Sequence, residues 1–430
     1  MSIVSKSSAY PVSVQSGIPS LPPTPSGWNR APMSKYLRSA ARPLVMKDDE
    51  AYRLVTVKRS RGGVVLREKL NGRDISVKSQ FEIKHGDFLI SKRQIVHGAC
   101  GLVPAALDGS IVSNEYSILR GNDKICLEFL NYLANSVYFQ QTCFHSSIGV
   151  HIEKMIFKLE RWLKWDFNIP PLAEQKRIAE ILSTWDRAIE TTEKLIANSE
   201  AQKKALMQQL LTGKKRLPGF SGEWQKMRLD QAAHIIVSNV DKKTDAAEQP
   251  IRLCNYMDVY RADQIKNDMP FMRATATSAQ IAKFGLKVGD VLITKDSEAP
   301  DDIAIPSYVA STAGDLVCGY HLAIIRPKKP LDGRFLKFYF DHPHTRYFFS
   351  SRANGATRFG LTVDAIETAP ILLPSIKEQT RISEVIGVAE NKIASLRPFV
   401  ESLRVEKSAL MQQLLTGKRR VKVKGEAQAA

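Results

Sequence analysis

The stretch ALMQQLLTGKKR at residues 205–216 decides the fold, because it returns as ALMQQLLTGKRR at residues 409–420. Eleven of the twelve positions are identical at an offset of 204 residues. Self-similarity at a fixed spacing is the signature of a repeated structural unit. The same offset relates Pro170, Glu174, Gln175, Arg177, Ile178 and Glu180 to Pro374, Glu378, Gln379, Arg381, Ile382 and Glu384. The sequence therefore predicts one long segment present twice.

The repetition extends beyond these segments. GDFLISK at residues 86–92 corresponds to GDVLITK at residues 289–295, and a Ser-Gly element precedes a tryptophan in each half, at Trp28 and Trp224. We therefore expect a mixed α/β fold of two tandem variable domains, each followed by a conserved helix. The predicted segments are a first variable domain at 1–168 with a flexible extension at 1–27, a central helix at 169–216, a second variable domain at 217–372, a C-terminal helix at 373–420 and a tail at 421–430.

Both conserved segments carry the start and stop signals of helices. Pro170, Pro171 and Pro374 stand just before the first turn, where a fixed φ and a missing N–H are tolerated. Gly213 and Gly417 supply the residue type that commonly ends a helix. About 39 residues lie between these signals, which corresponds to roughly 58 Å of helix at 1.5 Å per residue. This length exceeds that of a typical globular helix.

Apolar residues recur alternately three and four positions apart in both segments, which is the pattern of an antiparallel or parallel coiled-coil seam. A two-fold relation between the halves favours the antiparallel arrangement. Lys203 and Lys407 occupy the same seam position, and they either fix the register of the two helices or lie where the helices already diverge. The predicted seam residues are Ile178, Leu182, Trp185, Ile189, Ile196, Lys203, Leu206, Leu210, Ile382, Ile386, Ile393, Val400, Lys407, Leu410 and Leu414.

Pro398 falls inside the second predicted helix. Proline removes one backbone hydrogen bond and clashes with the preceding turn. We therefore expect either a kink at this position or two stacked helices.

The composition is that of a globular protein with an anionic partner. The 430 residues suffice for two to four domains, and 43% apolar with 25% charged residues is ordinary globular usage. The five cysteines form no C-x-x-C pair, and no apolar run is long enough to cross a membrane, so we expect the cytoplasm. The net charge of +18 favours nucleic acid, although ribosomal and membrane-peripheral proteins share such a charge.

The conserved segments resemble those of a known family. PPLAEQKRI at residues 170–178, PSIKEQTRI at 374–382, and the doubled ALMQQLLTGK with FSGEW at 220–224 are similar to the specificity (S) subunit of type I restriction-modification systems. The pattern P-x-x-x-E-Q-x-R-I opens a long helix twice, which makes the resemblance specific. It covers the whole architecture of two target-recognition domains and two conserved helices.

This resemblance implies a non-catalytic subunit that reads a bipartite, asymmetric sequence in double-stranded DNA. It implies two modification subunits that methylate adenine, and restriction subunits that translocate and cut DNA. S-adenosylmethionine, ATP and Mg²⁺ are accordingly expected in the partner subunits, and no cofactor is expected in this chain. No membrane partner is expected.

Each variable domain contains two candidate regions for DNA contact. In the first, residues 53–66 read as strand, basic turn and strand, with the turn expected to enter the major groove, and a second loop follows residues 86–90. In the second, the candidates are residues 350–360 and 273–278. The competing interpretation is a solvated surface or a structural turn. The predicted DNA-binding residues are Lys58, Arg59, Arg61, Lys92, Arg93, Arg273, Arg352, Asn354 and Arg358.

The excess positive charge is concentrated in the first variable domain, and the second is nearly neutral. If the second domain binds DNA, its basic residues must gather on one face. Its acidic residues Asp296, Glu298, Asp301 and Asp302 then either lie elsewhere or accept hydrogen bonds from cytosine amino groups.

No motif supports catalysis by this chain. NIPPL at residues 168–172 departs from the N-P-P-[FY] loop of adenine methyltransferases by the inserted Ile169 and a missing aromatic residue, and no phosphate-binding glycine loop is present. His342 and His344 lack partner ligands at metal-site spacing. The repeated Gly-Asp-x-Leu-Ile element is typical of a buried strand after a turn. We therefore expect neither catalytic residues nor metal ligands.

Two other classes of function compete with DNA recognition. A coiled-coil adaptor or RNA-binding protein would bind without DNA sequence selectivity, and a self-contained nuclease or methylase would act alone with Mg²⁺ or S-adenosylmethionine. The favoured interpretation is a molecular ruler, in which each variable domain reads a few base pairs and the helices set the gap between them. A span below roughly 58 Å corresponds to fewer than about 17 base pairs at 3.4 Å per pair.

Overall fold

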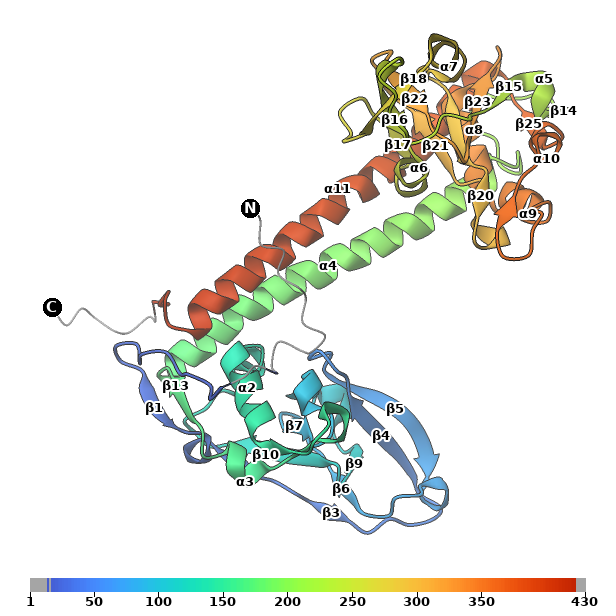
Figure 1. The fold of residues 1–430 in the computed structure, drawn as a ribbon. Coiled ribbons are helices and arrows are strands. Elements are labelled where there is room, and N and C mark those ends of the chain that lie inside the picture. The colour runs from blue at the N-terminus through green and yellow to red at the C-terminus, as the bar shows by residue number, and fades with distance from the viewer. Residues whose placement is uncertain (1–13, 15–16, 423–430) are drawn as a thin grey trace. The chain divides into compact units, whose positions relative to one another are not determined.

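The computed structural model describes residue 14 and residues 17–422. Its contacts divide the chain into two units, which are Met1–Thr192 with Phe399–Ala430 (unit 1) and Glu193–Pro398 (unit 2). Each unit contains one variable domain and a part of both long helices, α4 (Leu172–Leu210) and α11 (Ile376–Leu415) (Figure 1). The prediction of a mixed α/β fold with two tandem domains and long conserved helices is confirmed.

The first variable domain is built on two sheets with strand orders β2-β10-β7-β8 and β3-β6-β9-β4-β5, supplemented by the pairs β1–β13 and β11–β12. Helices α1 (Leu127–Leu133), α2 (Val137–His145) and α3 (Leu159–Trp162) contribute large side chains to one core with the first sheet. The strands are β1 (Asn29–Pro32), β2 (Leu37–Ser39), β3 (Pro43–Leu44), β4 (Ala51–Val57), β5 (Val64–Asn71), β6 (Gln80–Glu82), β7 (Phe88–Ser91), β8 (Cys100–Leu102), β9 (Ile111–Ser113), β10 (Tyr116–Gly121), β11 (Ser147–Ile148), β12 (Ile156–Phe157) and β13 (Asp166–Ile169).

The second variable domain has a five-stranded sheet, β15-β23-β19-β21-β17, a three-stranded sheet, β18-β16-β22, and the pairs β14–β25 and β20–β24. The strands are β14 (Gln225–Arg228), β15 (Ala233–Val237), β16 (Gln249–Cys254), β17 (Gln264–Ile265), β18 (Met272–Ala276), β19 (Val291–Thr294), β20 (Asp296–Ser297), β21 (Pro306–Val309), β22 (Leu316–Cys318), β23 (Leu322–Pro327), β24 (Phe359–Gly360) and β25 (Pro370–Leu373). The short helices are α5 (Leu229–Ala232), α6 (Tyr256–Arg261), α7 (Ser278–Phe284), α8 (Gly333–Asp341), α9 (Pro343–Ser350) and α10 (Val363–Glu367).

The repeated Gly-Asp turn places the same buried strand in both domains. Gly86 and Gly289 have φ of 79° and 95°, a conformation that glycine adopts without strain. Asp87 and Asp290 follow, are 0% and 1% exposed, and pair with arginines. Those arginines are Arg42 and Arg120 for Asp87, and Arg326 for Asp290. Each carboxylate also accepts the backbone N–H three residues earlier, from Lys84 at 2.8 Å and from Lys287 at 2.9 Å, which closes the turn ahead of the fully buried β7 and β19.

Within each unit the two long helices run in opposite directions. In unit 1, Lys407 near the end of α11 contacts Asp186 of α4. In unit 2, Lys203 near the end of α4 contacts Glu390 of α11. Helix α11 continues through the exposed Pro398 as one helix of 40 residues, so the alternative of two stacked helices is wrong.

Part of the predicted flexible extension belongs to unit 1. Residues 1–13 and 15–16, like residues 423–430 of the predicted tail, lie outside the described residues. The side chain of Asn168 on β13 donates a hydrogen bond to the carbonyl of Pro22 at 3.0 Å, and Thr24 donates to the Asn168 side-chain oxygen at 3.0 Å. Arg420 donates to the carbonyl of Ser26. These three contacts join Pro22, Thr24 and Ser26 to the rest of unit 1.

Candidate nucleic-acid interface and helix seam

The repeated glutamine of the E-Q motif joins each variable domain to the start of its own helix. Gln175 is 0% exposed; it accepts a hydrogen bond from the Cys126 N–H at 2.8 Å and donates to the carbonyls of Lys124 and Pro170 at 3.0 and 2.8 Å. The equivalent Gln379 bonds with Asp332 N–H, Pro330 O and Pro374 O at 2.8, 3.0 and 2.8 Å. Both amide donors and the amide oxygen of each glutamine thus have partners, which fixes the geometry, since leaving a buried polar group without a partner is costly.

The repeated glutamate of the same motif joins the start of one helix to the end of the other. Arg420 donates two hydrogen bonds to the buried Glu174 at 2.8 and 2.9 Å, and Trp28 donates its indole N–H at 3.1 Å. Such bidentate charged bonds are among the stronger hydrogen bonds in proteins. In unit 2, Arg216 forms the corresponding pair with Glu378 and lies over the ring of Trp224. The arginine that ends ALMQQLLTGKKR and ALMQQLLTGKRR therefore has a defined partner.

The predicted seam residues all lie in buried or half-buried positions on α4 and α11. Ile178, Leu182 and Leu414 belong to the core of unit 1, and Leu210, Ile382 and Ile386 belong to that of unit 2. The seam therefore packs against the variable domains as well as between helices. Fully buried Leu and Ile side chains each contribute about 1.5–3 kcal/mol.

Both seam lysines bond to an acidic residue of the other helix. Lys203 donates to Glu390 at 2.8 Å, and Lys407 donates to Asp186. Asp186 and Glu390 are themselves related by the offset of 204 residues. The contacts thus follow the two-fold relation of the repeat and support the interpretation in which these lysines fix the register.

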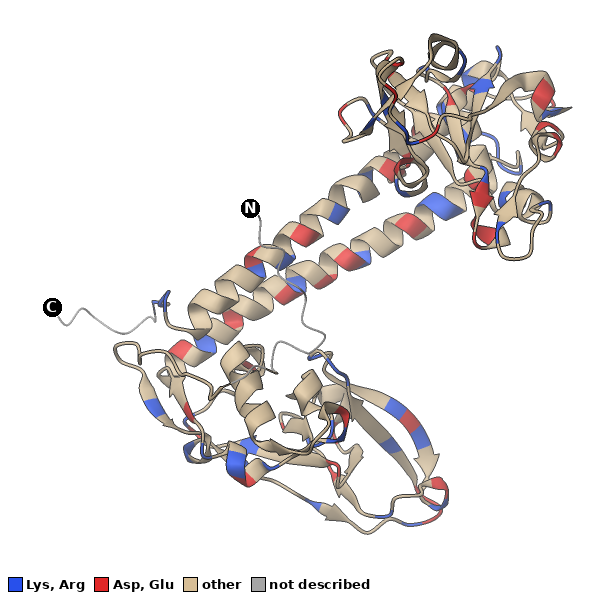
Figure 2. Ribbon diagram, in the orientation of Figure 1, with Lys and Arg blue, Asp and Glu red and all other residues tan. Residues whose placement is uncertain are grey.

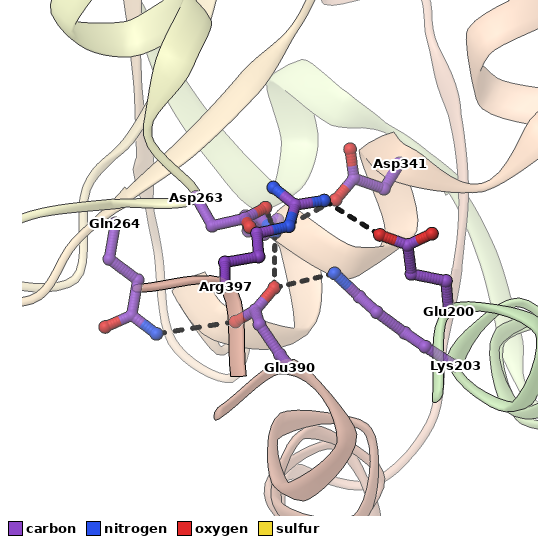
Figure 3. A network of polar contacts seen from close by, with 8 residues as sticks. Glu200, Lys203, Asp263, Gln264, Asp341, Glu390 and Arg397 are labelled. Carbon is purple, nitrogen blue, oxygen red and sulfur yellow. Dashed lines mark hydrogen bonds and ion pairs between the residues drawn. The ribbon is translucent and has the colours of Figure 1, made fainter. Parts of the chain in front are cut away.

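Figure 3 shows the polar cluster of unit 2 that contains Lys203, Glu390, Asp263 and Asp341. A second, deeply buried lysine joins the same contact. The Lys337 side chain on α8 is 1% exposed, and its Nζ lies 2.6 Å from Asp263, 3.0 Å from Asp341 and 2.8 Å from Glu390. Burial opposes a positive charge here, but Asp341, Glu390 and Asp263 outweigh it and raise the pKa of Lys337. The cluster ties the second variable domain to α11 and, through Lys203, to α4.

The two predicted DNA-binding loops of the first variable domain lie together. Arg59 donates to the Gln94 side chain at 2.8 Å and pairs with Glu153 at 3.1 Å, so the β4–β5 turn touches the loop after β7. Lys58, Arg59 and Arg93 are exposed, and Lys92 is half-buried. Figure 2 shows that the β4–β5 hairpin carries residues of both signs.

The β4–β5 turn, for which groove entry stays a prediction, is bonded to the segment that follows β7. Ser60 and Arg61 have φ of 55° and 57°, which folds the turn back onto the domain. Their backbone N–H groups donate to the carbonyls of His97 and Gly98 at 2.7 and 2.9 Å. Arg61 is half-buried, and this burial lowers its pKa. Arg61 is therefore less exposed than Lys58 and Arg59.

In the second variable domain the loop at 351–360 gathers three of the four predicted residues. Arg352 stacks over the Phe348 ring at 3.7 Å, and Asn354 exchanges two backbone hydrogen bonds with Gly360 that close the loop. Arg358 is exposed at the loop tip. Arg273 lies elsewhere, on β18 of the three-stranded sheet opposite Arg252. The structure thus brings together Arg352, Asn354 and Arg358 but not Arg273.

The loop after the repeated strand occupies the same place in both domains. Lys92 N–H donates to the Glu115 carbonyl at 2.8 Å, and Lys295 N–H donates to the His321 carbonyl at 2.9 Å. Beside that contact, Lys295 donates to the Asp296 side chain at 2.9 Å. Sequence reasoning selected Lys92 and missed Lys295, although both end the repeated Gly-Asp-x-Leu-Ile element.

Among residue 14 and residues 17–422 there is no group of three or more His, Cys, Asp or Glu side chains placed to hold a metal ion. In the same part of the chain, no helix is long and apolar enough to span a membrane.

The fold and the repeated contacts of Gln175, Gln379, Glu174 and Glu378 define a class of protein. In this class, each of two related variable domains binds one end of each of two long helices. Residues 47–200 and 221–397 match the model of a family described as type I restriction modification DNA specificity domain. The chain belongs to this family and carries its domain twice. The predicted relation to type I specificity subunits is confirmed.

Relatives with known names agree with this assignment. The chain is 27% identical over 274 residues to a putative type I restriction enzyme MjaX specificity subunit of Methanocaldococcus jannaschii, covering 59% of each chain. It is 23% identical over 290 residues to the MjaVIII specificity subunit of the same organism, covering 63% of this chain and 65% of that one. The matches thus span less than two thirds of these relatives.

The solved S subunit of a type I restriction-modification system from M. genitalium shares the fold. It aligns with a TM-score of 0.57 at 13% identity and covers 90% of this chain and 96% of its own.

Proposed function

We propose that this chain is the DNA sequence-recognition subunit of a type I restriction-modification complex and that it reads a bipartite, asymmetric target. The observation that carries the proposal is the duplication itself, because two domains are joined to shared helices by the same buried Gln and Glu contacts. Their candidate surfaces nevertheless differ in sequence and charge. Reading two unlike half-sites requires two domains that are attached to the helices in the same way but present different surfaces to DNA.

In this proposal the chain performs no catalysis. Two modification subunits methylate adenine with S-adenosylmethionine, and restriction subunits use ATP and Mg²⁺ to translocate and cut DNA in the cytoplasm. The net charge of +18 supports binding to duplex DNA, since contacts to phosphates release counterions. Phosphate contacts position the protein, and contacts to base edges supply the sequence selectivity.

The proposal is tested by expressing the chain with its modification subunits in a host and sequencing the methylated genome. We expect one methylated motif with two unlike half-sites separated by an unspecified spacer. Binding of the purified complex to that motif should weaken steeply with added salt. Binding without DNA sequence preference, or a preference for RNA, would instead support the adaptor or RNA-binding function.

We further propose that the helices determine the length of that spacer. Deleting residues 189–195 and 398–404 removes one heptad from each helix and retains both ion pairs, Asp186–Lys407 and Lys203–Glu390. The loss of seven residues shortens a helix by about 10.5 Å, which corresponds to about three base pairs. The methylated motif should keep both half-sites and lose about three base pairs of spacer. An unchanged spacer would refute the ruler.

A further inference from the structure

Asp296 of the second variable domain holds two neighbouring side chains. Lys295 Nζ donates to Asp296 Oδ1 at 2.9 Å, and His321 Nδ1 lies 2.5 Å from Asp296 Oδ2. A carboxylate only accepts hydrogen bonds, so the hydrogen of this contact resides on His321 Nδ1. In the neutral ring the other nitrogen, Nε2, is then an acceptor.

This trio borders the loop that carries Arg352, Asn354 and Arg358. Strand β20 pairs with β24, which places Asp296 opposite Gly360, and Leu361 N–H donates to the Lys295 carbonyl at 2.9 Å. A Cβ at position 360 would lie 3.0 Å from Asp296 Oδ1, so glycine permits this close approach. The trio and the basic loop thus form one surface.

His321 is accessible and held in an uncommon conformation. Its side chain is 33% exposed, against 19% for Lys295 and 20% for Asp296. Its φ of 72° lies in the left-handed region, which non-glycine residues seldom adopt and which concentrates at functional sites. Among the described residues, Nε2 has no hydrogen-bond partner. The Asp296 contact therefore orients a ring whose free edge is an acceptor.

The first variable domain places different chemistry at the equivalent position. There Glu115 takes the place of His321 in the backbone contact with the strand-end lysine, and its carboxylate binds Arg93 at 2.6 Å. Arg93 remains exposed and presents donors. The first domain therefore offers donors at this place, and the second offers an acceptor.

We propose that His321 Nε2 accepts a hydrogen bond from the exocyclic amino group of a base, adenine N6 or cytosine N4, in the major groove of the second half-site. Asp296 and Lys295 are positioning residues that set the tautomer of His321. The inference rests on the proposed function. It follows from base chemistry, because adenine and cytosine present amino donors in the major groove while guanine and thymine present carbonyl acceptors at the corresponding positions.

The substitution Asp296→Asn tests the positioning role. Lys295 continues to donate to the side-chain oxygen, so the new amide NH₂ faces His321 Nδ1 and donates to it. The ring hydrogen then moves to Nε2, which becomes a donor. In the complex with the modification subunits, the methylated motif should change at one position of the second half-site, from adenine or cytosine to guanine or thymine. The first half-site should stay the same.

The substitution His321→Asn tests the contact itself. Asparagine retains a donor that can reach Asp296 but has no atom at the place of Nε2. Discrimination at the same single position should fall roughly tenfold or more, the range expected for one lost base contact. His234→Asn is the matched control, because His234 is exposed on β15 of the same domain. This control should leave the motif unchanged.

Each outcome decides the inference. A change confined to one position, and to the same position in both variants, supports it. An unchanged motif in both variants overturns it while leaving the proposed function intact, and so does loss of selectivity at both half-sites, which would indicate general damage to the complex. If the unsubstituted complex methylates no bipartite motif, the proposed function fails and the inference fails with it.

Discussion

The two units use the same contact between seam lysine and acid, but each variable domain supports that contact differently. In unit 1, Tyr132 donates its hydroxyl to Asp186 at 2.6 Å, the same carboxylate that Lys407 binds. In unit 2, Phe338 takes the place of Tyr132, because Lys203 lies over the Phe338 ring as Lys407 lies over the Tyr132 ring, and Phe338 has no hydroxyl. Lys337 supplies the second donor to Glu390 instead. The helix side of the junction is thus repeated, and the domain side is not.

Because the supporting groups differ, the free-energy cost of removing them should also differ between the two units. The Tyr132 hydroxyl is neutral, so losing it removes one hydrogen bond. Lys337 is a buried cation among Asp263, Asp341 and Glu390, and its removal would leave the buried Glu390 with Lys203 as its remaining counterion and Asp263 and Asp341 without this lysine. Breaking a buried ion pair by removing one partner typically costs about 3–5 kcal/mol, whereas losing one hydrogen bond from a neutral donor to a carboxylate costs about 1.5–3 kcal/mol. Equivalent junctions should therefore respond unequally to mutation.

The largest effect is expected for Lys337→Met, which retains the length of the side chain and removes its charge. Unit 2 should lose about 3–5 kcal/mol of stability, the range observed when one partner of a buried pair is removed. Hydrogen exchange of the full chain, read by mass spectrometry at α8 and at the Glu390 region of α11, measures the loss within unit 2.

The matched control for this substitution is Lys204→Met. Lys204 is an exposed lysine next to Lys203 on α4, and exposed positions typically change stability by less than about 0.5 kcal/mol. Equal exchange in the Lys337 and Lys204 variants would show that the buried cluster does not stabilise unit 2.

The second effect is a loss of unit 2 stability in acid, caused by the carboxylates around Lys337. Burial raises the pKa of Glu390 and Asp263, but Lys337 and Lys203 outweigh it and lower both pKa values below their ordinary range. Groups with a lowered folded pKa stabilise the protein above their unfolded pKa of about 4, and this stability is lost as pH falls through the folded pKa. Burial raises the pKa of Asp341 on α8, which acts in the opposite direction, so the effect is measured at the Glu390 region of α11. Hydrogen-exchange protection there should fall in acid, and Glu390→Gln should flatten that fall.

The repeat made the helices and their ends predictable from the sequence. Residues that are identical at a fixed offset indicate contacts that both units make. In the structure they include the buried contacts of Gln175 and Glu174 and those of their counterparts Gln379 and Glu378. The seam followed from apolar spacing, since that spacing reflects one face of a helix. The prediction of two stacked helices from Pro398 was wrong, because a long helix that is packed along its length tolerates one missing backbone hydrogen bond.

The candidate surfaces were less predictable, because they differ between the two copies. Lys92 and Lys295 correspond in the repeat. Clusters of basic residues nevertheless predicted DNA contact only for Lys92 and for the loop at 351–360. The pairing of Asp296 with His321 joins positions 25 residues apart and depends on the pairing of β19 with β23. The folding of the β4–β5 turn onto His97 likewise depends on a contact between distant segments, which local charge patterns do not contain.

The smallest effect is expected for Tyr132→Phe, which makes unit 1 resemble unit 2 at this position without supplying a second lysine. The loss of one hydrogen bond to the charged Asp186 should cost about 1.5–3 kcal/mol. Lys407 still neutralises the carboxylate, so no buried charge is left unpaired. Hydrogen exchange in the Asp186 region of α4 measures the cost, with Tyr347→Phe as the control, since Tyr347 is 74% exposed. A loss as large as that of Lys337→Met would mean that the hydroxyl, rather than the lysine, holds the junction of unit 1, and the contrast between the two units would disappear.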